Sequence, residues 1–102
     1  MTFYVYVLRC ADDNLYIGYT NDLNRRFAEH SEGVNPRAYT FSRRPVTVLA
    51  TFEFPTAIQA FRAERMMKGW SRSKKLAFID EKVELFKFLS LKPKDRKRKL
   101  RL

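Results

Sequence analysis

The sequence predicts a single α+β domain, because strand-like and helix-like segments follow one another along 102 residues with no repeat or linker between them. Two apolar runs, Thr2–Cys10 and Leu15–Thr20, flank a short polar break and predict a β-hairpin. A third strand is expected at Val46–Phe54. Helical periodicity follows the second strand and again the third, so helices and one small sheet should share a core.

Composition limits the class of protein. Hydrophobic residues make up 45% of the chain, which excludes a disordered composition, and no apolar run approaches the roughly 20 residues of a membrane span. The N-terminus does not follow the order of a signal peptide. The single Cys10 excludes an internal disulfide, and one cysteine with one histidine excludes a structural zinc site. We expect Cys10 to serve only as a small packing residue at a strand end. We also expect the chain to be cytoplasmic.

Positive charge is concentrated at the C-terminal end of the sequence. Residues 1–90 carry 14 basic and 10 acidic side chains, whereas residues 91–102 carry 7 basic and 1 acidic. We therefore expect a globular domain at 1–90 and a basic, flexible tail at 91–102. The tail would either attract nucleic acid through its phosphates or serve only as a solvated end.

The hairpin brings together two tyrosines. If the strands pair antiparallel, Tyr6 shares a face with Tyr4 and Leu8, and Tyr16 shares a face with Gly18. A glycine inside a strand often marks the close approach of a ligand or another backbone. The tyrosines are either ordinary strand aromatics or part of a site.

The first helix places its two adjacent arginines differently. At about 100° per residue, Arg26 borders the buried face beside His30, whereas Arg25 points to solvent. An arginine at that border needs an acceptor, either a phosphate or an internal carboxylate. The expected helix caps along the chain are Thr20 or Asn21, with Asp22 in the first turn, then Thr56 and Ser71.

An irregular loop, Ser31–Pro45, interleaves cations with aromatic residues. It carries Arg37, Arg43 and Arg44 beside Tyr39 and Phe41. Such a loop suits a phosphate track with a base-stacking platform, and it equally suits a loop pinned by its two aromatic rings.

An acidic residue falls on the apolar face of the second helix, which should run from Thr56 to about residue 70. Glu64 lies in the middle of the face that packs on the sheet, where a carboxylate is costly unless it is paired or holds a cation. It is either a buried partner of Arg26 or another basic residue, or a ligand for a divalent ion. A last helix is expected to begin with basic residues and to continue with the apolar stripe Leu76, Ile79, Val83 and Phe86.

These residues together resemble the GIY-YIG endonuclease superfamily. The matching segments are Tyr4-Val5-Tyr6, Tyr16-Ile17-Gly18, the series Asp22, Arg26, His30, and the series Ala60, Glu64, Lys68, Trp70. The likeness covers roughly Phe3 to Ile79, and it is strongest to small bacterial members and to the nuclease domain of junction and flap nucleases. Tyr4-Val5 stands where the family has Gly-Ile.

The resemblance implies a three-stranded antiparallel sheet flanked by helices, and metal-assisted hydrolysis of a DNA phosphodiester. Tyr6 and Tyr16 would lie beside the attacking water, one of them as general base or relay, and Arg26 would stabilise charge on the phosphate. Glu64 would hold one Mg²⁺ or Mn²⁺. His30 would bind a tyrosine or the phosphate, or only support the packing. The candidate DNA contacts are Arg37, Arg43, Arg44, Lys68, Arg72, Lys74 and Lys75.

The predicted function is a structure-selective DNA endonuclease that acts on branched or single-stranded regions. One alternative is a nucleic-acid-binding module that keeps the fold without hydrolysis. A second is a nuclease subunit that needs a protein partner for substrate recognition.

Overall fold

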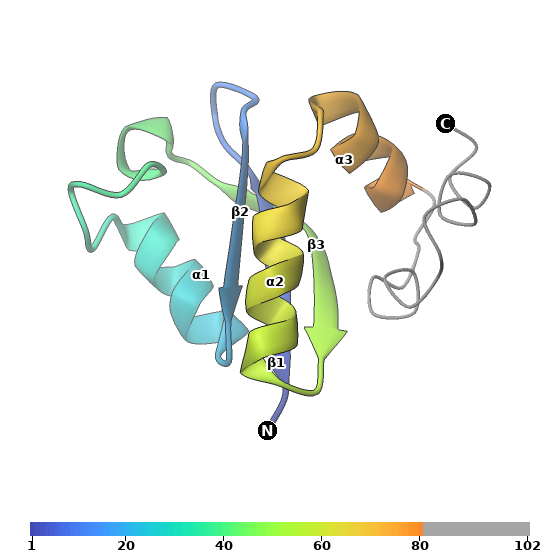
Figure 1. Cartoon of the computed structure of the whole chain (residues 1–102). Helices are drawn as coiled ribbons and strands as arrows, with labels where there is room; N and C mark the ends of the chain where they lie inside the picture. Colours follow the sequence, from blue (N-terminus) through green and yellow to red (C-terminus); the bar gives the residue numbers. More distant parts are fainter. Residues whose placement is uncertain (81–102) are drawn as a thin grey trace.

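Three antiparallel strands form the centre of the protein (Figure 1). In this computed structural model, which describes residues 1–80, they are β1 (Phe3–Arg9), β2 (Leu15–Thr20) and β3 (Thr47–Phe54). The sheet order is β2-β1-β3, so the first strand is central and pairs with both others. The predicted stripe residues Val83 and Phe86, the boundary at residue 90 and the basic tail lie outside the described residues.

Helices cover both faces of this sheet. Helix α1 (Leu23–Glu32) packs on one face, and α2 (Ala57–Lys68) and α3 (Arg72–Asp80) pack on the other. A short 3-10 turn, η1 (Phe41–Arg43), lies in the loop between α1 and β3. The predicted fold class, a three-stranded antiparallel sheet flanked by helices in one α+β domain, is confirmed.

The hairpin register agrees with the sequence pattern. Tyr6 lies opposite Gly18, and Leu8 lies opposite Tyr16, so both tyrosines face the α1 side. The alternate residues of β1 face α2, because successive strand side chains point to opposite faces. A one-residue slip would exchange these two sets, so burial on both faces fixes the register.

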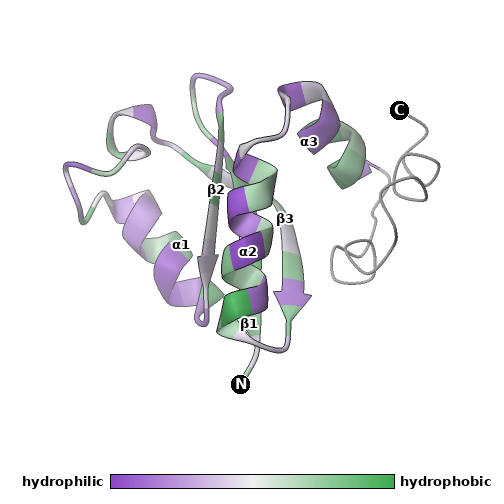
Figure 2. Ribbon diagram, in the orientation of Figure 1, coloured by the Kyte–Doolittle hydropathy of each residue, from purple (hydrophilic) through white to green (hydrophobic). Residues whose placement is uncertain are grey.

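Two apolar clusters, one on each face, hold the layers together. The larger lies between the sheet and α2 and α3, where Phe52, Phe54, Met67 and Phe78 pack with smaller side chains. The smaller lies under α1 and includes Tyr6, Leu8 and Cys10, which is buried at the strand end as expected. Most residues of α1 are hydrophilic, and the helix is drawn mainly in purple in Figure 2. No helix within residues 1–80 is long and apolar enough to cross a membrane.

The first helix begins differently from the prediction. Asp22 is itself the N-cap, because its extended backbone lets Oδ1 accept the Arg25 amide at 3.1 Å. Thr20, one of the two expected caps, instead accepts the Asp22 amide at 3.0 Å. Thr56 caps α2 as predicted, and the Ser71 hydroxyl accepts the Lys74 amide at the start of α3. These polar contacts satisfy N-terminal amides that the helices cannot pair internally.

Candidate active site

Tyr6 is the centre of the candidate site. Its ring leaves β1 and passes over Gly18 on β2, and a Cβ built at position 18 would collide with the phenol ring and hydroxyl. The close neighbour that a strand glycine suggested is therefore the side chain of Tyr6, not a ligand or another backbone. Tyr6 is 3% exposed, so this fit places its hydroxyl inside the protein under α1.

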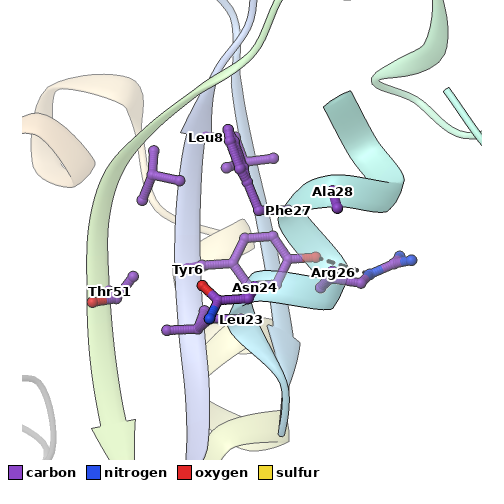
Figure 3. A pocket seen from close by; sticks show the side chains of 9 residues that line it. Tyr6, Leu8, Leu23, Asn24, Arg26, Phe27, Ala28 and Thr51 are labelled. Atoms are coloured by element: carbon purple, nitrogen blue, oxygen red, sulfur yellow. Dashed lines mark hydrogen bonds between the residues drawn. The ribbon is translucent and has the colours of Figure 1, made fainter. Parts of the chain in front are cut away.

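The Tyr6 hydroxyl has two partners on α1. Arg26 Nε donates to it at 3.2 Å, and His30 Nε2 lies 3.0 Å away (the Arg26 contact is dashed in Figure 3). Residues 26 and 30 are one helical turn apart, so both side chains reach the same point on β1. This confirms that Arg26 borders the buried face beside His30, and it shows His30 hydrogen-bonded to a tyrosine.

The face of α1 and β3 beside Tyr6 is hollowed. A cavity of about 400 Å³ lies there, and Leu8, Leu23 and Val48 contribute to its lining together with the Tyr6 ring (Figure 3). The lining is mainly apolar, so it does not suit a phosphate. The polar end of the site lies at the Tyr6 hydroxyl.

His30 continues the polar contacts to Thr40. His30 is 4% exposed, and its Nδ1 lies 2.7 Å from Thr40 Oγ1, which is also buried. Thr40 lies in the loop before η1 and was missed by sequence analysis. An irregular loop has no periodicity that would mark one threonine as inward-facing, so the sequence carried no signal for it.

Arg26 also has a carboxylate partner. Its Nη1 lies 3.2 Å from Glu29 Oε1 on the same helix, and both side chains are more than a third exposed. Such an exposed pair contributes about 0–1 kcal/mol, so Glu29 is a weak competitor for an incoming anion. Arg25, the neighbouring arginine, is exposed as predicted.

Tyr16 reaches these side chains from β2, and Tyr6, Tyr16, Arg26 and His30 together are called the tyrosine cluster. The Tyr16 ring centre lies 6.3 Å from that of Tyr6, 5.0 Å from His30 and 6.0 Å from Tyr39, on which it stacks. Arg43 lies over the Tyr39 ring at 4.0 Å and pairs with Asp12. Tyr39 thus holds the loop against β2, which agrees in part with the interpretation of a loop pinned by its two aromatic rings.

Glu64 lies on the buried face of α2, as predicted, with 5% exposure. Its partner is Lys68, one turn further along the helix, at 2.5 Å, and not Arg26. Lys68 Nζ is also 5.9 Å from the Tyr16 ring centre, which connects the carboxylate to the tyrosine cluster. Glu64 and Lys68 line an open hollow of about 340 Å³ together with Phe61 and Arg65.

The pKa values of the buried Tyr6 hydroxyl and the His30 imidazole are shifted from their ordinary values. Burial, helped by the neighbouring Tyr16, raises the pKa of Tyr6 to about 12, and the Arg26 guanidinium opposes this rise. Burial and the positive charge of Arg26 lower the pKa of His30. At neutral pH the resting site therefore holds a protonated phenol beside a neutral imidazole.

The predicted DNA-contacting residues spread over the loop, α2 and α3. Arg37 is exposed, while Arg44 lies 4.6 Å over Phe41. Arg72 binds the β1–β2 turn through Asp13, and Lys74 lies 4.5 Å over Trp70. Most of these cations thus already have intramolecular partners, and the remaining predicted residue, Lys75, is half-buried.

Residues 2–77 match the family model described as the GIY-YIG catalytic domain. This chain belongs to the GIY-YIG family. A UPF0213 protein of Bacillus pumilus is 45% identical over 78 residues, which cover 76% of this chain and 79% of that protein. A UPF0213 protein of Listeria innocua is 42% identical over 81 residues, which cover 79% of this chain and 89% of that one.

Two solution NMR structures resemble this GIY-YIG domain. A UPF0213 protein of Bacillus halodurans has 40% identity and a TM-score of 0.52, and a protein of E. faecalis has 34% identity and a TM-score of 0.57. Each comparison covers 78% of this chain and 84% of the other. The matched span of the GIY-YIG domain includes the tyrosine cluster, Thr40 and Glu64.

Proposed function

We propose that this chain is a divalent-metal-dependent endonuclease that hydrolyses DNA phosphodiester bonds, with a preference for branched or partly single-stranded DNA. The observation that carries the proposal is the meeting of Tyr6, Tyr16, Arg26 and His30 in one cluster. The match to a catalytic domain model supports it. The resemblance of the motifs to those of junction and flap nucleases supports the choice of substrate.

Arg26 and the tyrosines would bind the scissile phosphate and move the proton of the attacking water. The Arg26 side chain is 40% exposed, so its guanidinium can contact an anion while Nε stays on Tyr6. It would stabilise the charge that grows on the scissile phosphate. Tyr6 carries its proton at neutral pH, so it acts as a base only when its own proton leaves, with His30 beside it as an acceptor.

Glu64 would hold one hard cation, at a hollow that Arg65 and Lys68 also line. Its carboxylate lies at an open hollow, and no three His, Cys, Asp or Glu side chains within residues 1–80 are grouped as a metal cage. Mg²⁺ is commonly held by one or two carboxylates, with water and phosphate at the other positions. Such a cation would polarise the phosphate and favour ionisation of the attacking water.

Cation binding at Glu64 requires Lys68 to move. Lys68 now neutralises the carboxylate, but its side chain is 54% exposed and can turn toward solvent. The released ammonium would be free to contact a DNA phosphate. The predicted contacts from Arg37, Arg43, Arg44, Arg72, Lys74 and Lys75, and from the basic tail, would then hold the rest of the DNA.

A panel of single strands, flaps, forks and branched junctions, incubated with Mg²⁺ or Mn²⁺, tests the proposal. We expect cleavage by the wild type, loss of cleavage in Arg26→Ala and Glu64→Gln, and retained cleavage in Arg25→Ala. Arg25 is the matched control because it is the same residue type on the solvent side of α1. Absence of cleavage on every substrate by folded protein would reject the proposal.

One observation favours a second candidate, a nucleic-acid-binding module without hydrolysis. The Glu64 carboxylate is already compensated by Lys68, as it would be in a purely structural ion pair. That candidate predicts equal DNA affinity with and without Mg²⁺, and no change in affinity on Glu64→Gln. The nuclease proposal predicts that Mg²⁺ strengthens DNA binding in the wild type and not in Glu64→Gln.

A further inference from the structure

A buried chain of hydrogen bonds runs from Tyr6 through His30 to Thr40. Tyr6 Oη lies 3.0 Å from His30 Nε2, and His30 Nδ1 lies 2.7 Å from Thr40 Oγ1. The three side chains are 3%, 4% and 1% exposed. The backbone holds Thr40 in place independently of His30, because the Thr40 carbonyl accepts the Arg43 amide and begins the η1 turn.

The two neutral tautomers of His30 distribute protons differently at Tyr6. Arg26 Nε only donates, so the Tyr6 oxygen already accepts one hydrogen bond. With the proton on Nδ1, His30 donates to Thr40, and its Nε2 accepts the Tyr6 proton. With the proton on Nε2, the Tyr6 oxygen must accept a second N–H, and its own proton must turn to the neighbouring Tyr16.

We propose that Thr40 is a positioning residue that accepts the Nδ1–H of His30 and thereby keeps the Nε2 lone pair facing Tyr6. The first arrangement gives each of the two rings one donor and one acceptor role, whereas the second crowds two donors onto the Tyr6 oxygen. The Thr40 hydroxyl could donate or accept, so the crowding at the Tyr6 oxygen favours the arrangement in which Thr40 accepts. Thr40 then stabilises the Nδ1–H tautomer, in which Nε2 is free to accept the Tyr6 proton. The effect on rate rests on the proposed nuclease function, but the tautomer is a property of the resting protein.

The consequence for hydrolysis is a proton relay. As the water oxygen forms its bond to phosphorus, its proton passes to Tyr6 Oη, and the Tyr6 proton passes to His30 Nε2. The bond from phosphorus to the departing sugar oxygen breaks, and that oxygen takes a proton from solvent water. The imidazolium keeps its Nδ1–H on Thr40 and later returns the extra proton to solvent.

Several charged or titratable groups face the His30 ring. They are Arg26 and Glu29 on α1, Tyr6 on β1 and Tyr16 on β2. A change at Thr40 leaves all four in place. The variant Thr40→Val removes the hydroxyl at nearly constant volume and changes no charge. Its effect on His30 is therefore due to the lost hydrogen bond.

Nitrogen NMR of the full chain tests the assignment directly, because the protein has a single histidine. Spectra of the ¹⁵N-labelled ring above pH 7 distinguish Nδ1–H from Nε2–H. We expect Nδ1–H in the wild type, Nδ1–H in Thr40→Ser, and a shift toward Nε2–H in Thr40→Val. The control is Thr20→Val, another buried threonine, which should keep the wild-type tautomer. A wild-type Nε2–H ring, or an unchanged ring in Thr40→Val, would overturn the proposal.

Kinetics separate this inference from the proposed function. Thr40→Val should lower kcat by about 10- to 100-fold with little change in KM, and Thr40→Ser should restore it. Full kcat in a Thr40→Val protein with a changed tautomer would overturn the relay. If the wild type cleaves no substrate, the nuclease proposal fails, while the spectra still decide the tautomer. If Thr40→Val does not fold, the wild-type and Thr40→Ser spectra decide it.

Discussion

Replacing Gly18 with alanine would test whether the glycine exists to seat Tyr6. The added Cβ would overlap the Tyr6 ring and hydroxyl, so the phenol would have to leave its place between Arg26 and His30. Overpacking of this kind costs about 1–3 kcal/mol. Alanine recovers roughly 0.5–1 kcal/mol in a strand, because glycine loses more backbone entropy on folding. The expected net loss of stability therefore lies between about 0 and 2.5 kcal/mol, with a midpoint near 1 kcal/mol.

Denaturant unfolding, followed by the fluorescence of the single Trp70, would measure this loss. We also expect the pKa of His30 to rise toward its ordinary value, because the displaced ring admits water. Gly69→Ala is the matched control, since the nearest atom to its Cβ would be a carbonyl oxygen at ordinary contact distance. If Gly18→Ala is as stable as the wild type and the His30 pKa is unchanged, the argument for Gly18 is wrong.

Three further predictions follow from the same contacts. Tyr6→Phe should retain the fold but lose cleavage, since the ring stays and the proton-transferring oxygen goes; circular dichroism and a substrate assay would check both, and an active variant would contradict the relay. Lys68→Met should bind Mn²⁺ more tightly than the wild type without DNA, because the competing ammonium is gone; titration calorimetry would measure this, and equal affinity would show that Lys68 does not compete. The lowered pKa of His30 implies that its contribution to stability is complete above about pH 6.5 and declines as pH falls through the folded pKa; unfolding at several pH values should show this decline in the wild type and less of it in His30→Gln.

The sequence predicted the features that follow from regular strand and helix periodicity, namely which face of its element each residue occupies. Alternation in the hairpin placed Tyr6 on a face with Leu8 and Tyr16 on a face with Gly18, and the register of the structure shows that these are the same face. Helical spacing separated Arg26 from Arg25 and buried Glu64. These inferences succeed because period-2 and 3.6-residue patterns fix which side a residue occupies before tertiary contacts are known.

What the sequence did not predict depends on irregular or competing contacts. Thr40 meets His30 only because the loop folds back over α1, and no local pattern describes that path. Lys68 was predicted as a phosphate contact, and the sequence also left open a basic partner for Glu64. In the resting protein Lys68 is that partner, four residues further along the helix, where such pairs form. Asp22 is the N-cap of α1 because its backbone is extended. That backbone conformation is set by the turn before the helix, and the residue types alone do not specify it.

The central claim is that the tyrosine cluster and Glu64 act on one phosphate. A crystal structure of the protein with Mn²⁺ and a branched DNA tests it most directly. The anomalous signal of the manganese would locate the cation. We predict a cation on Glu64, Lys68 turned to the DNA, and a phosphate between that cation and Arg26. A structure in which DNA is bound while Lys68 still neutralises Glu64, with the phosphates remote from Tyr6, would contradict the claim.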